Sequence, residues 1–218
     1  MSKAENEQMM DMLIEYGYLS TERVIKAFKN VDRADFAPEE YRKGCYEDTP
    51  LPIGRGQTIS APSMVAIMSE KLDCRPGMKI LEIGAGSGYQ AAILAEIIGS
   101  KGKLFTVERI KEVADNAKKV LGKYKNVKLI VGDGTLGYKK EAPFDRIIVT
   151  AASPKIPEPL VEQLKEGGKM LIPIGNYLFG QELDLITKVK GKIKEEFVTG
   201  VVFVPLIGKY GASEPPSP

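Results

Sequence analysis

Leu81-Glu82-Ile83-Gly84-Ala85-Gly86-Ser87-Gly88 decides the fold of this chain, because an apolar strand ends there in three alternating glycines before an alanine-rich helical segment. Glycine is needed where the backbone takes a positive φ, or where a ligand must approach without meeting a Cβ. The N-terminus of the following helix also offers N–H groups that lack intrahelical partners. A strand, a glycine turn and a helix in this order predict a nucleoside-binding unit.

The spacing of the glycines argues against a dinucleotide site. A dinucleotide fingerprint reads G-x-G-x-x-G, and its third glycine allows close packing of helix on strand. Tyr89 stands where that glycine would fall, so the pattern here is G-x-G-x-G. It resembles the first motif of the class I S-adenosylmethionine-dependent methyltransferases, whose cofactor has no phosphate. The resemblance implies S-adenosyl-L-methionine as cofactor, bound beside Gly84, Ala85, Gly86, Ser87 and Gly88.

Two acidic residues close the next strands of the pattern. Glu108 ends the apolar run 103–107, where the acidic residue of such a unit accepts hydrogen bonds from the ribose hydroxyls; a plain surface carboxylate is the alternative. Asp133, before Gly134, closes the third strand, where its carboxylate can meet the adenine amino group; a simple turn aspartate is the alternative. Ligands bind beyond the carboxyl ends of parallel strands, so these residues should converge with Gly84 and Thr150.

Composition and charge remove several classes of protein. The 218 residues suffice for one sizeable α/β domain and are few for two. A net charge of +2, from 31 basic and 29 acidic residues, gives no footprint for nucleic acid, and no apolar run could span a membrane. Two cysteines and no secretory signal predict a cytoplasmic protein. We expect neither nucleic acid nor membrane as a partner, and favour a monomer.

The chain contains no histidine. This removes the usual general base near neutral pH, any Ser-His or Cys-His nucleophile pair, and most zinc sites. We therefore expect no metal and a reaction that needs no imidazole.

Alternating segments from residue 62 onward predict an α/β fold. The expected architecture is Rossmann-like and doubly wound, with a mostly parallel seven-stranded sheet, an antiparallel C-terminal strand pair and N-terminal helices. One domain is expected over 1–212, with the N-terminal helices and a substrate loop (1–61) packed on the core (62–212) and a disordered tail at 213–218. Helices are predicted over 62–72, 89–98, 111–121 and 159–164, strands over 79–83, 103–107, 127–131, 145–150 and 169–174, a turn at 167–168, and terminal strands over 183–189 and 195–204.

The segment 31–61 has little periodicity and many prolines and glycines, which predicts an ordered loop packed over the site. It ends in Gly56-Gln57-Thr58-Ile59-Ser60-Ala61-Pro62, where the proline suits the first turn of a helix. Ser60 and the N–H groups beside it form a candidate anion site at the positive end of this helix. The alternative is that Ser60 is only an N-cap.

The motifs outside the glycine loop resemble those of the protein-L-isoaspartate O-methyltransferases, which methylate isomerised aspartyl residues. The resemblance covers roughly residues 10 to 210. It is carried by Asp48-Thr49-Pro50-Leu51-Pro52-Ile53-Gly54, by Gly56 to Pro62, by Pro154-Lys155-Ile156-Pro157-Glu158-Pro159-Leu160 and by Phe203-Val204-Pro205-Leu206.

The resemblance implies roles for individual residues. Ser60 matches the active-site serine, and Thr58 and Ile59 line the same loop near methionine and substrate, with Gln57 beside them. Family members commonly carry histidine after the A-P pair, whereas this chain has Ser63. Further matches are Glu108 with Arg109 at the ribose, Asp133 with Gly134 at the adenine, and Val204, Pro205 and Leu206 in a C-terminal strap that helps to close the pocket on the substrate.

The implied reaction agrees with the missing histidine. A carboxylate has a reference pKa near 4, so the acceptor is already an anion at neutral pH. The enzyme then supplies alignment, and the methyl ester cyclises to a succinimide that reopens partly as normal aspartate. Two alternatives stay open: a methyltransferase acting on another carboxylate, a small molecule or RNA, and a cofactor-binding partner subunit without catalysis.

Overall fold

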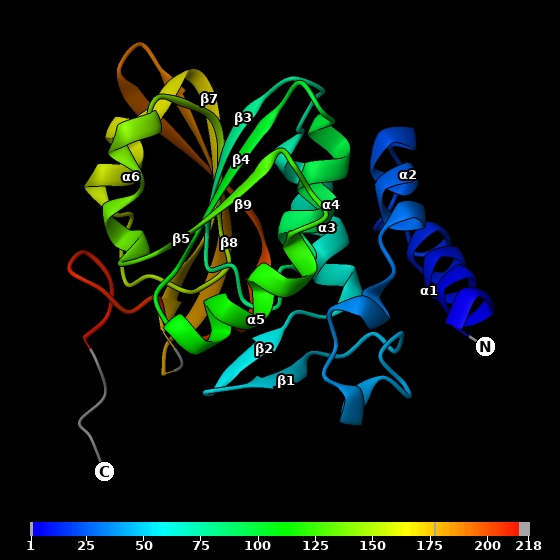
Figure 1. Cartoon of the computed structure of the whole chain (residues 1–218). Coiled ribbons are helices and arrows are strands. Elements are labelled where there is room, and N and C mark those ends of the chain that lie inside the picture. Colours follow the sequence, from blue (N-terminus) through cyan, green and yellow to red (C-terminus); the bar gives the residue numbers. More distant parts are fainter. Residues whose placement is uncertain (1, 177, 214–218) are drawn as a thin grey trace.

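The protein is described by a computed structural model that covers residues 2–176 and 178–213 (Figure 1). A seven-stranded sheet forms its centre, in the order β5-β4-β3-β6-β7-β8-β9. Neighbouring strands from β5 to β7 are parallel, and β8 is antiparallel to both of its neighbours, which confirms the predicted sheet. The strands are β3 (Lys79–Ile83), β4 (Lys103–Glu108), β5 (Val127–Val131), β6 (Phe144–Val149), β7 (Leu164–Asn176), β8 (Gly180–Val189) and β9 (Lys192–Val201).

The chain changes direction across the sheet at β3, which pairs with β4 on one side and β6 on the other. Helices α4 (Tyr89–Ile98) and α5 (Lys111–Leu121) cover one face, and α6 (Glu158–Gln163) lies on the other (Figure 1). Two 3₁₀ turns, η3 (Gly134–Leu136) and η4 (Lys139–Glu141), connect β5 to β6. In such open sheets the ligand lies outside the carboxyl ends of the strands where their order reverses. The β3 and β6 ends therefore locate the site.

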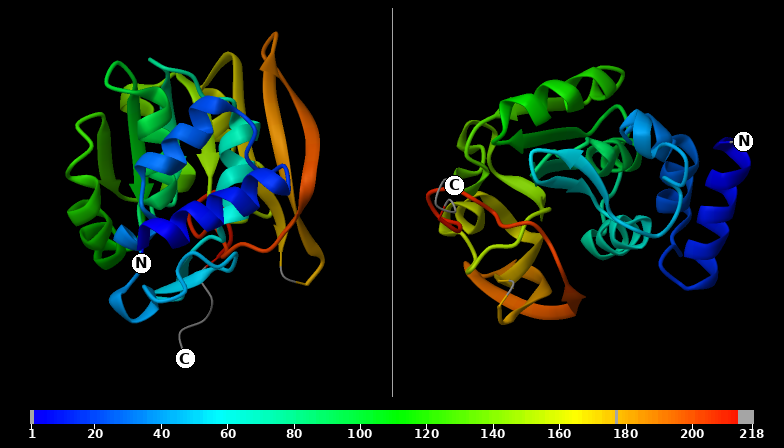
Figure 2. Two further views of the ribbon diagram at one scale, coloured as in Figure 1. Left: turned by 90° about the vertical axis from the view of Figure 1, so that its right-hand side faces the viewer. Right: turned by 90° about the horizontal axis from the view of Figure 1, so that it is seen from below.

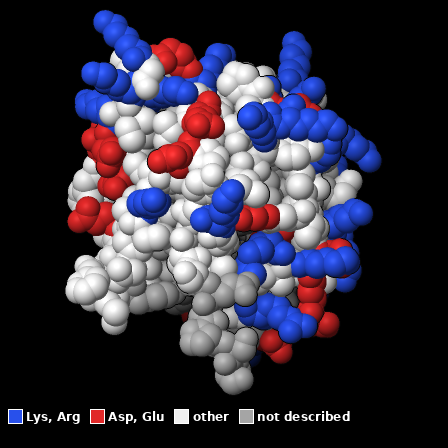
Figure 3. All heavy atoms as spheres, turned by 90° about the vertical axis from the view of Figure 1, so that its left-hand side faces the viewer, with Lys and Arg blue, Asp and Glu red and all other residues white. Residues whose placement is uncertain are grey.

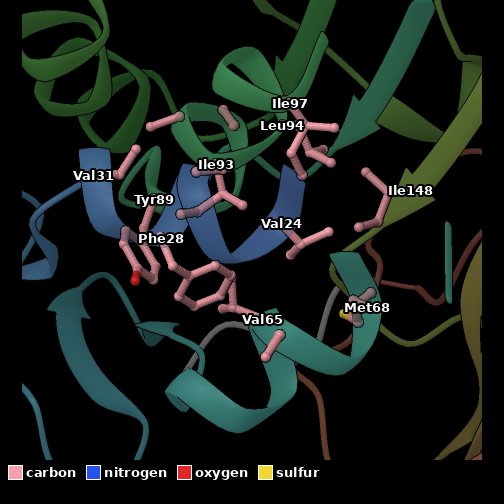
Figure 4. Close-up of a cluster of buried hydrophobic side chains, with 14 of the residues drawn as sticks. Val24, Phe28, Val31, Val65, Met68, Tyr89, Ile93, Leu94, Ile97 and Ile148 are labelled. Atoms are coloured by element: carbon pink, nitrogen blue, oxygen red, sulfur yellow. The ribbon is translucent and has the colours of Figure 1, made fainter. Parts of the chain in front are cut away.

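The N-terminal helices α1 (Ser2–Glu15) and α2 (Glu22–Asn30) pack against α3 (Pro62–Leu72) and α4. Val24 and Phe28 of α2 point toward Met68 of α3 and Tyr89 of α4 in one buried cluster (Figure 4). The rings of Phe28 and Tyr89 meet edge to face, with centroids 6.2 Å apart. Burial of this cluster supplies the main apolar contribution to holding the N-terminal segment on the sheet.

Residues 31–61 are more regular than predicted. They contain η1 (Arg33–Asp35), η2 (Glu39–Tyr41) and a hairpin of β1 (Leu51–Gly54) and β2 (Gln57–Ile59). The turn at residues 54–56 has three positive φ angles, a geometry that two glycines make accessible. Seen from below, this hairpin lies between the N-terminal helices and the red C-terminal segment (Figure 2). The expected loop is therefore a two-stranded sheet of its own.

Two predicted details of the C-terminal half are wrong. The glycine pair 167–168 does not separate a helix from a strand, because β7 already begins at Leu164. Gly167 takes φ +73° within β7, and the pairing with β6 is irregular between Phe144 and Arg146, so the glycines form a bulge. The last strand ends at Val201, three residues earlier than predicted.

Of the predicted tail 213–218, only Ser213 belongs to the described residues. Within residues 2–176 and 178–213, no helix has the length and apolar character needed to cross a membrane. The same part of the chain contains no group of three or more Cys, Asp or Glu residues placed to hold a metal ion.

Candidate active site

The glycine loop between β3 and α4 is built for close approach. Gly84 and Gly86 have φ angles of +93° and +53°. The Thr150 hydroxyl donates a hydrogen bond of 2.7 Å to the Gly84 carbonyl, and a Cβ on Gly84 would overlap the Thr150 hydroxyl oxygen. The adjoining ends of β3 and β6 thus fix the first turn of the loop from both sides.

Glu108 joins this loop to the end of β4. Its side chain is 7% exposed. One carboxylate oxygen accepts from the Gly86 N–H at 3.1 Å, and the other accepts from the Ile110 N–H at 2.9 Å. The carboxylate is therefore held in place by two backbone donors, and it lines the larger cavity of the site. This position meets the geometric requirement of a ribose ligand.

The larger cavity has a volume of about 300 Å³ and lies at the carboxyl ends of β3, β4 and β6. The β1–β2 hairpin closes one side, and a C-terminal segment, residues 204–212, which we call the strap, closes another. Its lining includes the predicted residues Gln57, Thr58, Gly84, Gly86, Glu108, Arg109, Gly134, Val204, Pro205 and Leu206. It also includes Thr150, which was expected at this edge of the sheet, and Arg55, Gly56, Ile110 and Ile207, among others that were not assigned from the sequence.

A smaller cavity of about 40 Å³ adjoins the larger one. The two share four lining residues, Thr58, Gly84, Gly86 and Thr150. Its other lining residues are the predicted Ile59, Ser60, Ala85 and Ser87, and Val65, Met68, Tyr89 and Gln90, which were not predicted. The glycine loop and the segment 56–62, which we call the acceptor loop, thus both contribute to the wall that the two cavities share.

Ser60 is not the N-cap of α3, so that alternative is wrong. The helix begins at Pro62, its N-cap is Ala61, and no side chain makes a capping hydrogen bond there. The carboxylate of Asp48 instead accepts the Ser63 N–H at 2.8 Å and neutralises the positive end of the helix from outside. The predicted anion site at this helix end is therefore partly taken by Asp48, while Ser60 faces the smaller cavity.

An ion pair crosses from the hairpin to α5. Arg55, at the turn of the hairpin, pairs with Glu112 in the first turn of α5. Both side chains are about 60% exposed, so water and salt screen the interaction. Because Arg55 also lines the larger cavity, this pair sits at the cavity's edge.

Two of the predicted site residues do not line either cavity. Gly88 is the N-cap of α4, and a Cβ there would lie 3.0 Å from Leu121 of α5, so this glycine lets the helix pack closely. Asp133 accepts from the Thr135 N–H and hydroxyl with one oxygen, and from the Lys209 N–H with the other. Burial acts to raise the pKa of Asp133, but these hydrogen bonds outweigh it and hold the pKa below its usual range. Its adenine contact stays a prediction.

A buried carboxyl group lies beneath the glycine loop. Glu82, in the middle of β3, is fully buried, and neither of its oxygens has a hydrogen-bond partner among the described residues. Burial raises the pKa of Glu82 to about 8; the Thr106 hydroxyl opposes this shift, and the nearby charge of Glu108 adds to it. The sequence gives no signal for this, because the residue reads as one polar position in an apolar strand.

Comparison with known proteins places the chain in a family. The family of protein-L-isoaspartate(D-aspartate) O-methyltransferases matches residues 4–211. The chain is 54% identical to a protein-L-isoaspartate O-methyltransferase of Methanopyrus kandleri, over 97% of this chain and 95% of that protein. It is 53% identical to that of Methanothrix thermoacetophila, over 94% and 96%.

Solved structures of the same name have the same fold. One protein-L-isoaspartate O-methyltransferase superposes with a TM-score of 0.87 at 31% identity, over 94% of this chain and 67% of that chain. A Plasmodium falciparum structure, in complex with S-adenosyl-L-homocysteine, superposes with a TM-score of 0.82 at 29% identity, over 93% and 98%. The chain thus belongs to the protein-L-isoaspartate(D-aspartate) O-methyltransferase family.

Proposed function

We propose that this protein transfers a methyl group from S-adenosyl-L-methionine to the free carboxylate of L-isoaspartyl residues in damaged proteins and peptides. The observation that carries the proposal is the common wall of the two cavities, where Thr58 of the acceptor loop meets Gly86 of the glycine loop. Its relatives of 50–55% identity carry the name of this activity. The resulting ester cyclises to a succinimide when the neighbouring backbone nitrogen displaces methanol.

The larger cavity fits the nucleoside part of this cofactor. Glu108 presents a carboxylate to it, held by the N–H groups of Gly86 and Ile110, and a ribose diol is a donor pair that suits such an acceptor. Apolar Ile83, Val107 and Ile110 stand beside Glu108 in the lining and suit a flat purine ring. When bound, the cofactor supplies an electrophilic methyl group on a sulfonium centre. Arg109 and Gly134 are proposed as further contacts on this side.

The acceptor side of the site needs no general base. A carboxylate with a pKa near 4 arrives ionised at neutral pH, so its oxygen is a nucleophile without proton removal. Ser60 lies in the wall of the smaller cavity, where its hydroxyl is proposed to donate to one carboxylate oxygen and aim the other. Among the described residues that line this cavity, none is Lys or Arg. A neutral donor leaves the nucleophile reactive, and orientation at about 3 to 3.5 Å lowers the barrier.

The walls of the site divide the proposed binding roles. Thr58 lines both cavities, and Ile59 and Ser60 follow it in the wall of the smaller one, so the three are proposed to contact both cofactor and acceptor. Gln57 and the strap residues Val204, Pro205 and Leu206 line the larger cavity at its outer side and are proposed to hold the peptide around the isoaspartyl residue.

Residues 1–212 are proposed to act as one monomeric, cytoplasmic domain that uses no nucleic acid. Cys45 and Cys74 are both buried and unpaired, as expected where thiols stay reduced. On the face that Figure 3 shows, basic and acidic side chains lie interspersed, which does not favour a polyanion as partner.

A pair of peptides tests the proposal. One peptide contains an isoaspartyl residue, and its twin contains normal aspartate at the same place. With S-adenosyl-L-methionine labelled in the methyl group, we expect label in the isoaspartyl peptide only. Equal label in both peptides, or label in RNA or a small carboxylic acid alone, would contradict it.

Ser60→Ala separates catalysis from cofactor binding in the same assay. We expect kcat to fall by about tenfold to a hundredfold, because one hydrogen bond to a charged acceptor is lost in the transition state. Cofactor affinity, measured by calorimetry, should stay within about twofold. Normal turnover by this variant would show that Ser60 does not have the proposed role. If the wild-type protein binds the cofactor but methylates neither peptide, it is a partner subunit without catalysis.

A further inference from the structure

The carboxylate of Asp133 accepts three hydrogen bonds from within the protein, and Asp133 does not line the larger cavity. Asp133 lies just after β5, in a short turn. One of its carboxylate oxygens accepts hydrogen bonds from the Thr135 N–H, at 2.8 Å, and from the Thr135 hydroxyl, at 2.7 Å. The other oxygen accepts the Lys209 N–H at 2.8 Å. Lys209 is 76 positions further along the chain and belongs to the strap. The end of β5 and the strap are thus joined through this one side chain.

Thr135 extends the same connection. Its side chain is fully buried, and its hydroxyl oxygen accepts the N–H of Tyr210 at 3.1 Å. The hydroxyl therefore donates to Asp133 and accepts from the strap at once. Two consecutive backbone N–H groups of the strap, at 209 and 210, thus donate hydrogen bonds to the side chains of Asp133 and Thr135.

The strap has a second attachment at its other end. Ala152, just after β6, donates its N–H to Val204 and accepts the N–H of Leu206, at 2.8 and 2.7 Å. The N–H of Ala212 closes residues 206–212 into a loop by donating to the Leu206 carbonyl at 2.8 Å. Val204 and Leu206, which line the larger cavity, are thus held by Ala152 directly, and residues 207–208 lie between this attachment and the Asp133–Thr135 attachment at 209 and 210.

The approach of the strap to Asp133 depends on a residue without a side chain. A Cβ built on Gly208 would overlap the Asp133 carboxylate. Any larger residue at 208 must therefore push the strap and the carboxylate apart, which a backbone loop tied at both ends accommodates only by losing one attachment.

We propose that Asp133 is a positioning residue that fixes the strap, so that residues 204–207 form the outer wall of the cavity. This proposal rests on the proposed function, which places the cofactor's nucleoside and the peptide in the larger cavity. It assigns the Asp133 carboxylate to the protein itself, and leaves the neighbouring Gly134, which does line the cavity, to face the ligand.

Asp133→Asn isolates the strap contact. Asparagine keeps one oxygen for the Thr135 N–H, but places an NH₂ group against the Lys209 N–H, which then has no acceptor. Gly208→Ala reaches the same contact from the strap side. Gly132→Ala is the matched control, because nothing lies within 4 Å of a Cβ at that position.

Limited trypsin digestion reports strap opening without any need for catalysis. Cleavage after Lys209, followed by mass spectrometry of the released C-terminal peptide, should be about tenfold faster in Asp133→Asn and Gly208→Ala than in the wild type or Gly132→Ala. An unchanged cleavage rate in both strap variants would overturn the proposal. Thermal denaturation identifies any variant that fails to fold, and Gly208→Ala keeps the test open if Asp133→Asn does.

Two ligands separate the strap role from an adenine contact. S-Adenosyl-L-homocysteine and S-inosyl-L-homocysteine differ in the amino group that Asp133 would recognise. We expect Asp133→Asn to weaken both equally and to raise KM for the isoaspartyl peptide about tenfold with little change in kcat. Selective loss of the adenosyl ligand, with normal trypsin resistance, would assign Asp133 to the adenine and overturn the proposal. If neither ligand binds the wild type, the proposed function fails, and the digestion still tests the strap.

Discussion

The two sides of the site are held in different ways. The glycine loop, Glu108 and Thr150 stand on the ends of neighbouring strands, where backbone bonds such as Gly84 N–H to Val107 at 2.8 Å and Thr150 N–H to Ile83 at 2.9 Å fix them. The hairpin and the strap lie outside the seven-stranded sheet. The strap is attached by backbone bonds to Ala152 and by the Asp133 carboxylate. The side chains of Asp48 and Arg55 join the hairpin region to α3 and α5. Changes on the sheet side should therefore act mainly on cofactor binding and stability. Changes on the other side should act mainly on peptide binding, except at Asp133, where we expect an effect on both ligands.

The largest effect is expected from Glu82, on the sheet side. Its pKa in the folded protein, about 8, lies above the reference value of 4.5, so folding is favoured by a bound proton. Stability should fall as pH rises from about 4.5 to about 8, by on the order of 4 to 5 kcal/mol. Glu82→Gln cannot ionise and should lose this pH dependence, becoming more stable than the wild type at pH 8 in urea unfolding.

The control for Glu82 is Glu162→Gln, an exposed residue of α6. Its unfolding curve should follow the wild type at every pH. If Glu82→Gln and the wild type keep a constant difference in stability from pH 5 to 9, the buried carboxyl group does not carry the proposed proton.

Glu108→Ala tests the cofactor wall itself. The change removes the proposed ribose acceptor, together with its hydrogen bonds from Gly86 and Ile110. Hydrogen bonds to charged groups contribute about 1.5 to 3 kcal/mol, so we expect the Kd of S-adenosyl-L-methionine to rise by about tenfold to a hundredfold in calorimetry. Glu162→Ala should leave Kd unchanged. If only the peptide KM rises and the cofactor Kd is unchanged, Glu108 contributes to peptide binding and not to cofactor binding.

Asp48→Ala tests the acceptor side. It removes the acceptor of the Ser63 N–H at the start of α3, a capping interaction of about 1 kcal/mol. Because Ser60 lies three residues before this contact, we expect the peptide KM to rise severalfold while cofactor Kd is retained. Asp48→Asn keeps an oxygen at this position and should recover most of the effect in steady-state kinetics. A change in cofactor Kd of similar size would contradict the assignment of Asp48 to the peptide side of the site.

Arg55→Gln should have the smallest effect. The ion pair with Glu112 is exposed, so salt already screens it. We expect less than about a threefold change in peptide KM at low salt and no difference from the wild type at 0.5 M NaCl. A large effect that persists in high salt would show that the hairpin is held as firmly as the sheet side.

The same division explains how much the sequence could predict. Regular alternation predicted the helices α3, α4 and α5 and the strands β3 and β5 at their observed bounds, and the parallel strands β4, β6 and β7 with different ends. Glycine spacing located the cavity. These features depend on residues near one another in the chain. The hairpin at 51–59 was predicted as a loop, because its strands are three and four residues long and contain Pro52.

Contacts between distant segments were beyond the sequence. Asp48 as the acceptor at α3, and Asp133 as the acceptor of Lys209, both join elements that no local pattern relates. Arg55 at the cavity could not be distinguished from an ordinary turn residue. The buried state of Glu82 likewise depends on helices that cover β3 from elsewhere in the chain.

The wall shared by the two cavities has a consequence for inhibitor design. Thr58, Gly84, Gly86 and Thr150 belong to both cavities, so the two ligands that we propose for them would lie close together. A bisubstrate compound, in which a nucleoside and an isoaspartate mimic are joined by a linker of one or two atoms, would make the second binding event intramolecular. Such a compound would gain affinity from both halves, and its selectivity would come from the acceptor half, because nucleoside pockets are common among methyltransferases.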